Sequence, residues 1–149
     1  MLWFDDQAEE AVNFYISIFP DSEISEIVRY SKAGFETHKQ PEGRIQTIQV
    51  RINGQWYTAL NGGPVFQFNE AISLQVLCDT QQEIDYYWEK LTEGGAEGPC
   101  GWLKDKFGLS WQVAPSILPL LLQDPERSEK VTEAYLKMKK FNINELLQA

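Results

Sequence analysis

Only a few residues of this chain have side chains suited to acid–base, nucleophilic or metal chemistry. His38 is the single histidine and stands in SKAGFETHKQPEG, a polar stretch where a solvated loop side chain is expected. One histidine is too few for a His-based metal site, and position suggests no Ser–His–Asp or Cys–His set. Asp105 is the one carboxylate of the turn-like stretch WLKDKFG, where turn formation explains an aspartate better than catalysis. No catalytic residue is therefore assigned.

The cysteines and glycines of the chain indicate no further catalytic or cofactor-binding site. Cys78 and Cys100 lie outside any CxxC pattern, so free structural thiols are predicted, with a disulfide as the alternative. The stretches NGGP and EGGAEG do not match a GxGxxG loop between a strand and a helix, and no P-loop is present. No nucleotide-type cofactor is expected.

The stretch GLSWQVAP, residues 108–115, carries polar side chains within a strand-like run. Alternation places Leu109, Trp111 and Val113 on one face, and Ser110, Gln112 and Ala114 on the other. A polar row of this kind is expected where the inner face of a curved sheet lines a cavity.

Aromatic residues suggest a binding site. Large rings come from the segments that would surround such a cavity, namely Trp56, Phe66, Phe68, Trp102 and Trp111. Core packing alone would explain most of them, but an apolar pocket with a few polar groups is also typical of small-molecule sites. Gly62 and Gly63 could be hinges of a mobile lid formed by NGGPVFQFN.

Two related helices are predicted to position these residues. DDQAEEAVNFYISIFP begins with the capping-box spacing of Asp6 and Glu9 and stops at Pro20. DTQQEIDYYWEKLTEGG has Thr80 and Glu83 as its capping box and ends at a double glycine. A shift of 73 positions aligns Asp6 with Asp79, Glu10 with Glu83, Ala11 with Ile84, Phe14 with Tyr87, Tyr15 with Trp88 and Ile18 with Leu91. This alignment indicates an internal duplication.

Apolar runs that read as strands surround each helix. In the first copy they are Leu2–Phe4, Ile24–Tyr30, Ile45–Ile52 and Gln55–Leu60, the last two joined by the hairpin signal Asn53-Gly54. In the second copy they are Ile72–Cys78, a segment around Cys100–Leu103 and Ser110–Ala114.

The order of these elements predicts an α+β fold of tandem βαβββ modules in one domain, residues 1–149. Module 1 spans about residues 1–61, a linker 62–71, module 2 about 72–115, and a helical extension 116–149.

Composition narrows the class of partner. The formal net charge of −9 argues against nucleic acids and anionic membranes, which require clustered Lys and Arg. Neither a signal peptide nor an apolar stretch of membrane-spanning length is visible, so a cytoplasmic location is expected.

Several separated motifs carry a family resemblance that covers essentially the whole chain. LWFDDQAEEAVNFY, SLQVLCDTQQEIDYYWEKL, CGWLKDKFGLSWQVAP and YLKMKKFNINEL resemble the PhnB-like branch of the glyoxalase/bleomycin-resistance/dioxygenase (vicinal oxygen chelate) superfamily. That branch is also labelled the 3-demethylubiquinone-9 3-methyltransferase domain family. The resemblance implies two curved half-barrels enclosing a cleft, and a homodimer. A Rossmann-type S-adenosylmethionine loop is missing, so methyl transfer is not expected.

Metal-dependent members of this superfamily place ligands on the first and last strands of each module. By resemblance the positions are Gln112, the neighbourhood of Leu60 and Asn61, Ile72 or Ser73, and a position before Met1. Asn61, Ser73 and Gln112 are neutral oxygen donors and weak partners for a transition metal, so no metal or other cofactor is expected.

The leading hypothesis is a protein that binds a small molecule in the cleft between its modules. Polar contacts are expected from Asn61, Ser73 and Gln112, and aromatic contacts from Trp56, Phe68, Trp102 and Trp111. One alternative is a divalent-metal enzyme of lyase, isomerase or dioxygenase type with Gln112 as a ligand. Another is a resistance-type protein that sequesters a compound without turnover.

Overall fold

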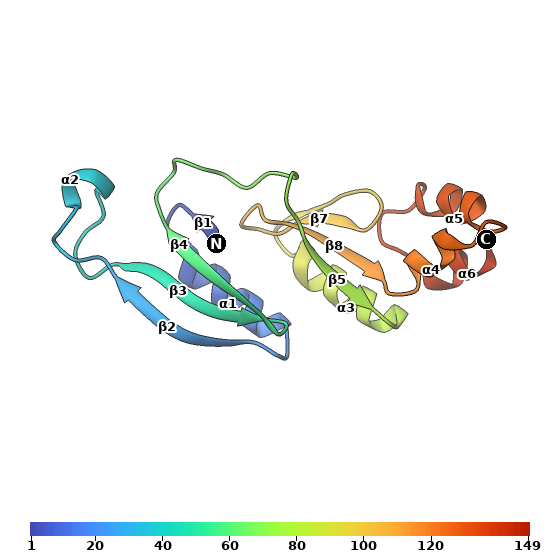
Figure 1. The fold of residues 1–149 in the computed structure, drawn as a ribbon, viewed down its shortest axis with the longest axis horizontal. Coiled ribbons are helices and arrows are strands. Elements are labelled where there is room, and N and C mark those ends of the chain that lie inside the picture. The colour runs from blue at the N-terminus through green and yellow to red at the C-terminus, as the bar shows by residue number, and fades with distance from the viewer. The chain divides into compact units, whose positions relative to one another are not determined.

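Strands and helices follow one another in the same order in two parts of the chain, apart from one additional short helix in the first part (Figure 1). The computed structural model describes all residues, Met1–Ala149. It divides into two compact units, Met1–Gln67 and Phe68–Ala149. Each unit contains one four-stranded sheet with a helix against it, and the second unit also contains the C-terminal helices.

The first unit contains one mixed sheet. Its elements are β1 (Leu2–Phe4), α1 (Ala8–Ile18), β2 (Glu23–Arg29), α2 (Phe35–His38), β3 (Ile45–Ile52) and β4 (Gln55–Asn61). The strand order is β1-β4-β3-β2, with β1 parallel to β4 and the other neighbours antiparallel. Asn53 and Gly54 both have positive φ, 48° and 79°, which confirms the predicted two-residue hairpin.

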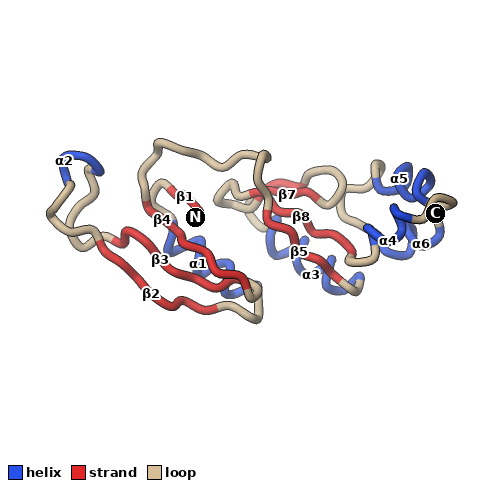
Figure 2. The backbone as a smooth tube through the Cα atoms, viewed as in Figure 1, coloured by secondary structure: helices blue, strands red, loops and turns tan.

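The second unit repeats this topology. Its elements are β5 (Leu74–Cys78), α3 (Gln81–Thr92), β6 (Ala96–Glu97), β7 (Trp102–Lys104) and β8 (Ser110–Pro115), in the sheet order β5-β8-β7-β6. Again the first strand is parallel to the last, and the others pair antiparallel. The tandem βαβββ prediction is therefore confirmed. Three helices follow: α4 (Leu118–Gln123), α5 (Ser128–Tyr135) and α6 (Ile143–Gln148) (Figure 2).

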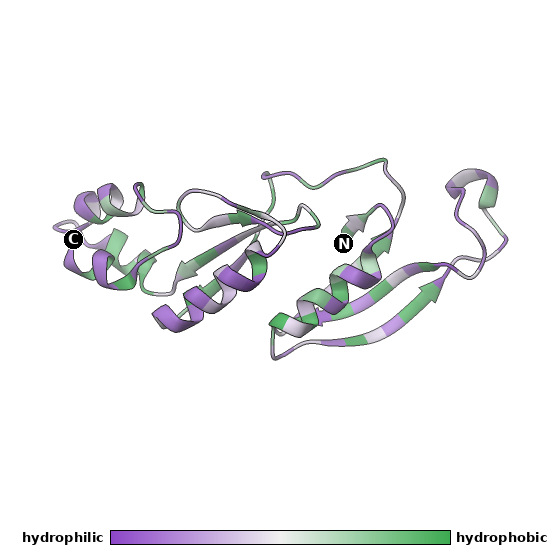
Figure 3. Cartoon of the chain, turned by 180° about the vertical axis from the view of Figure 1, so that it is seen from behind, coloured by the Kyte–Doolittle hydropathy of each residue, from purple (hydrophilic) through white to green (hydrophobic).

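One face of each sheet is covered by its helix. In the first unit, apolar side chains of α1 and of the central strands are fully buried together, among them Val12, Tyr15, Ile48, Val50 and Ala59. In the second unit, α3 contributes Ile84, Trp88 and Leu91, and the sheet contributes Val76, Trp111 and Val113. Hydrophilic and hydrophobic residues alternate along both helices (Figure 3), and the buried residues of each recur at the spacing of one helical face.

The two related helices begin differently. Thr80 Oγ1 accepts from the Glu83 N–H at 3.2 Å while the Glu83 carboxylate accepts from the Thr80 N–H at 3.0 Å, so the predicted capping box of α3 is confirmed. The capping box predicted at Asp6 is wrong, because α1 begins at Ala8 without a local side-chain cap. Asp6 instead pairs with Arg44 at 3.3 Å.

Two short elements depart from the sequence prediction. The strand β6 has only two residues, too few for a recognisable pattern. The stretch around His38, expected to be a loop, contains the helix α2. The His38 ring is half-buried rather than solvated: Nδ1 accepts from the Gln40 N–H at 3.0 Å, and the ring lies 4.5 Å from that of Tyr30.

Polar contacts hold the segment around Phe141 against the rest of the second unit. The side chain of Gln81 donates to the Phe141 carbonyl at 3.0 Å and accepts from the Ile143 N–H at 2.9 Å. The Cys100 and Gly101 N–H groups donate to backbone carbonyls just before Phe141. None of the helices combines the length and apolar character needed to cross a membrane.

Candidate functional site

The candidate site lies on the face of the second sheet that is turned away from α3. Directly paired residues share a face, and here the pairs are Trp102 with Gln112 and Lys104 with Ser110. The partner Gln75 of Gln112 on β5 joins this set. The predicted alternation in β8 is confirmed, since the neighbouring positions Trp111 and Val113 face the core.

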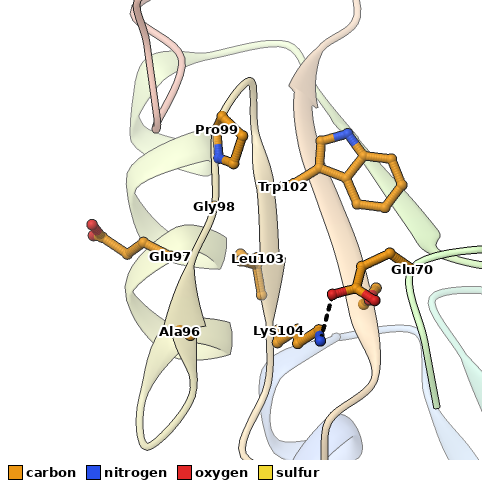
Figure 4. Close-up of a pocket in the computed structure, with 9 residues that line it drawn as sticks. Glu70, Ala96, Glu97, Gly98, Pro99, Trp102, Leu103 and Lys104 are labelled. Atoms are coloured by element: carbon orange, nitrogen blue, oxygen red, sulfur yellow. Dashed lines mark ion pairs between the residues drawn. The ribbon is translucent and has the colours of Figure 1, made fainter.

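A pocket of about 520 Å³ opens beside this face. Its lining comes from β6, β7, the turn between them, the start of β8 and the segment before β5, namely Glu70, Ala96, Glu97, Gly98, Pro99, Trp102, Leu103, Lys104 and Ser110. Figure 4 shows the Trp102 indole and the Glu70 carboxylate on the same side of β7. The pocket therefore has an aromatic wall with charged groups at one end.

An ion pair marks the charged end of the pocket. Lys104 Nζ lies 2.5 Å from Glu70 Oε1, and the two side chains are 41% and 63% exposed (Figure 4). The hydrogen bond from Lys104 lowers the pKa of Glu70 below its usual value, and the lysine charge adds to this effect. At neutral pH the pair therefore consists of an ammonium and a carboxylate.

Ser110 supplies an unpaired polar group next to this ion pair. Its side chain is fully buried, and its Oγ has no hydrogen-bond partner within the protein. A buried hydroxyl without a partner is costly, and most such groups in proteins are satisfied by another group or by water. Ser110 also lines the pocket, so an occupant that displaces the groups covering this oxygen can provide that partner.

The opposite edge of the pocket is held by β6 and the turn that follows it. Glu97 points away from Trp102 and Glu70 in Figure 4, and its carboxylate accepts from Trp88 Nε1 at 3.0 Å and from Lys139 at 3.4 Å. The hydrogen bond from Trp88, followed by that from Lys139, lowers the pKa of Glu97. A Cβ on Gly98 would lie 2.9 Å from the Trp102 carbonyl oxygen, so glycine permits this close approach.

Two residues predicted as polar contacts are brought together. Gln112 Nε2 donates to Ser73 Oγ at 2.8 Å, and both side chains are half-buried on or beside the open face. They are not among the residues that line the pocket, although Gln112 is the cross-strand partner of Trp102. Both side chains therefore lie on or beside the face next to which the pocket opens.

Two other predicted contacts lie in the cores. Asn61 pairs with Phe4 on the helix-covered face; its Oδ1 accepts from the Ala8 N–H at 2.9 Å, and its Nδ2 donates to the Ile45 carbonyl at 3.1 Å. Trp111 is buried on the α3 side and donates from Nε1 to Asp105. Both side chains therefore have structural roles, and the pocket does not include them.

The remaining predicted aromatic contacts lie elsewhere. Trp56 is an exposed residue of β4 in the first unit, with the Arg51 guanidinium 6.0 Å from its ring centre. Phe68 is half-buried in the segment before β5. Of the aromatic residues predicted to contact a ligand, Trp102 alone lines the pocket.

Sequence reasoning missed Lys104, Ser110 and Glu70 as pocket residues. The first could have been found, because alternation in the short run Trp102–Lys104 puts residues 102 and 104 on one face. Ser110 was placed on the polar face but not selected as a contact. Glu70 stands in the irregular segment between the units' sheets, where no periodicity assigns a direction to a side chain.

The donor chemistry of this face does not fit a divalent metal. No three His, Cys, Asp or Glu side chains cluster to hold an ion. Of the positions implied by resemblance, Gln112 and Ser73 are neutral and hydrogen-bonded to each other. The amide oxygen of Asn61 accepts from the first N–H of α1. Transition metals in such sites favour imidazole, thiolate or carboxylate ligands.

The two cysteines are free, as predicted. Burial raises the pKa of the Cys78 thiol to about 12, and the nearby carboxylates of Glu83 and Asp79 add to the shift. A thiol with this pKa stays protonated at neutral pH, so Cys78 is a packing residue rather than a nucleophile.

The two βαβββ units define a protein built from tandem modules of one topology. More narrowly, the chain belongs to the family described as 3-demethylubiquinone-9 3-methyltransferase, whose family model matches residues 1–114. Residues 115–149, which include part of the resemblance drawn from the sequence, lie outside that match.

Solved structures agree with this assignment. A Bacillus cereus structure described as "Putative 3-demethylubiquinone-9 3-methyltransferase, PhnB protein" is 37% identical, with 77% of this chain and 95% of that chain covered and a TM-score of 0.65. Protein PA1353 from Pseudomonas aeruginosa is 18% identical, with 76% and 92% covered and a TM-score of 0.59, and so supports the fold alone. None of the curated proteins matches the chain.

Proposed function

We propose that this protein binds a small molecule with an aromatic or apolar body in the pocket of its second unit. The observation that carries the proposal is the buried, unpartnered hydroxyl of Ser110 at the lining of a pocket whose wall is the Trp102 indole. A volume of about 520 Å³ suits a metabolite-sized ligand.

The residues that line the pocket are better suited to binding a ligand than to catalysing a reaction. Its titratable groups are one ammonium and two carboxylates, and these carboxylates already accept hydrogen bonds from Lys104, Trp88 or Lys139. The proposal does not extend to methyl transfer, since the chain lacks the glycine-rich loop of a Rossmann-type S-adenosylmethionine site. Nor does it extend to metal-assisted chemistry, because the donors on this face are neutral or already paired.

The test uses a neutral aromatic probe, 3-phenylpropanamide, and the indole N–H signals of the tryptophans in an NMR titration. We expect saturable binding in the millimolar range, because an ordinary gain of about 0.3 kcal/mol per non-hydrogen atom amounts to only a few kcal/mol for a probe of this size. The Trp102 signal, assigned by its loss in Trp102→Ala, should move most.

A matched control distinguishes pocket binding from weak binding to any exposed ring. Trp102→Ala should weaken binding at least about fivefold, since an aromatic contact contributes about 1 kcal/mol beyond its buried area. Tyr86→Ala, which removes an exposed ring of α3 outside the pocket, should leave it unchanged. No shift of the Trp102 signal, or equal binding by Trp102→Ala, would refute the proposal.

A further inference from the structure

We propose that the ligand of this pocket is an organic anion, a carboxylate on an aromatic body, and that Glu70 occupies the same lysine when the pocket is empty. This inference rests on the proposed function above and names the chemical class of its ligand.

Lys104 is the one cation among the lining residues. It lies in β7, paired through the backbone with Ser110 of β8, so the sheet fixes where its side chain starts. The carboxylate of Glu97 is engaged by Trp88 and Lys139 and points away from this end of the pocket (Figure 4). The local charge that faces a ligand is therefore set by Lys104 and Glu70.

Glu70 is the partner that can be exchanged. It comes from a segment without helix or strand, and its side chain is 63% exposed. Exposed ion pairs contribute little to stability because water and salt compete with them. A ligand carboxylate with further contacts in the pocket can therefore replace that of Glu70 at little cost.

Ser110 makes the exchange favourable for a carboxylate in particular. Once the ligand has displaced the groups that cover it, the Ser110 hydroxyl can donate to one carboxylate oxygen while the ammonium of Lys104, its cross-strand partner, donates to the other. Hydrogen bonds to an ionised acceptor are about twice as strong as neutral ones. A cationic ligand would instead lie beside the Lys104 ammonium, which opposes it.

The test compares three probes that share one aromatic body: 3-phenylpropanoate, 3-phenylpropanamide and 3-phenylpropylamine. Titrations at neutral pH and low salt should rank the anion first, about fivefold tighter than the amide, since exposed ion pairs are worth up to about 1 kcal/mol. The amine should bind most weakly. High salt should reduce the advantage of the anion.

Charge-removing variants assign this preference to the two residues. Lys104→Gln should lower the affinity for the anion to that for the amide. Glu70→Gln should raise the affinity for the anion severalfold without changing that for the amide, because it removes the internal competitor. Lys106→Gln and Glu93→Gln make the same charge changes on exposed residues outside the lining and should leave the ranking unchanged.

The outcomes separate this inference from the proposed function. If the probes bind at Trp102 but the anion has no advantage, or the amine is preferred, the anion proposal is wrong and the binding site stands. An anion preference that survives Lys104→Gln also overturns it. If no probe binds at Trp102, the proposed function itself fails.

Discussion

Asp105 fixes the turn that sets β7 against β8. Its Oδ1 accepts from the Phe107 and Leu109 N–H groups at 2.9 and 3.1 Å, and its Oδ2 accepts from Trp111 Nε1 at 2.8 Å. The residue is only 3% exposed. The structural role predicted for this aspartate is confirmed, and it is the turn that places Lys104 opposite Ser110 at the pocket.

The substitution Asp105→Asn should destabilise the protein by about 1 to 3 kcal/mol. If the amide oxygen of the new asparagine accepts the hydrogen bonds from the two backbone N–H groups, its NH₂ group lies against the indole N–H of Trp111. The NH₂ group and the indole N–H are then two buried donors that face each other without an acceptor. Urea unfolding should show a lower midpoint with an unchanged m-value.

A double-mutant cycle tests this cause. Trp111→Phe removes the facing donor, so Asp105→Asn should cost about 1 kcal/mol less in that background than in the native one. Additive costs would show that the loss arises from the turn's backbone contacts and not from the indole.

At the scale of elements, prediction from sequence succeeded where the signal is local. The strand Ile45–Ile52, its Asn53-Gly54 turn and the capping box at Thr80 were identified because each pattern lies within a few residues. Prediction failed where the local structure depends on a residue that is distant in sequence. The N–H that opens α1 is satisfied by Asn61, which is 53 positions away in sequence, while Asp6 turns to Arg44.

The same distinction separates the parts of the site. The polar face of β8 follows from alternation along one strand, and Trp102 was predicted from the aromatic residues of the neighbouring segments. Glu70 could not be found, because its place beside Lys104 depends on the path of an irregular segment. Glu70, which completes the charged end of the pocket, thus lies in a segment whose sequence shows no periodic pattern.

One side chain of α3, that of Gln81, contributes to holding the C-terminal segment in place. Replacing Gln81 with alanine removes both hydrogen bonds to the backbone around Phe141. An unpaired, partly buried backbone group costs at least about 1 kcal/mol, so local opening of residues 138–149 should become about fivefold more frequent. Hydrogen exchange measured by mass spectrometry should show faster exchange in this segment than in β7 and β8.

The neighbouring position provides the control for that experiment. Gln82→Ala makes the same chemical change at an exposed position of α3 and should leave exchange in residues 138–149 unchanged. Uniformly faster exchange across the second unit in Gln81→Ala would mean that the contact stabilises the whole unit and not the attachment alone.

At the scale of the whole molecule, exposed apolar side chains gather on one sheet edge. All seven residues of β2 are exposed, and Ile24, Ile27 and Val28 are 37%, 42% and 42% exposed. The strand is the last in its sheet, so its outer backbone groups have no strand partner. Long apolar edge strands are usually covered, because they otherwise template aggregation.

We propose that a second copy of this chain covers β2, in line with the homodimer that the family resemblance implies. A two-fold contact places the same edge on both partners, so one substitution alters the interface twice. Ile27→Glu should therefore convert a species of twice 17.2 kDa into a monomer in sedimentation experiments. Leu120→Glu introduces the same charge at an exposed apolar residue of α4 and should leave the dimer intact. A wild-type monomer at high concentration would contradict the dimer, and a dimer unaffected by Ile27→Glu would exclude β2 as its contact.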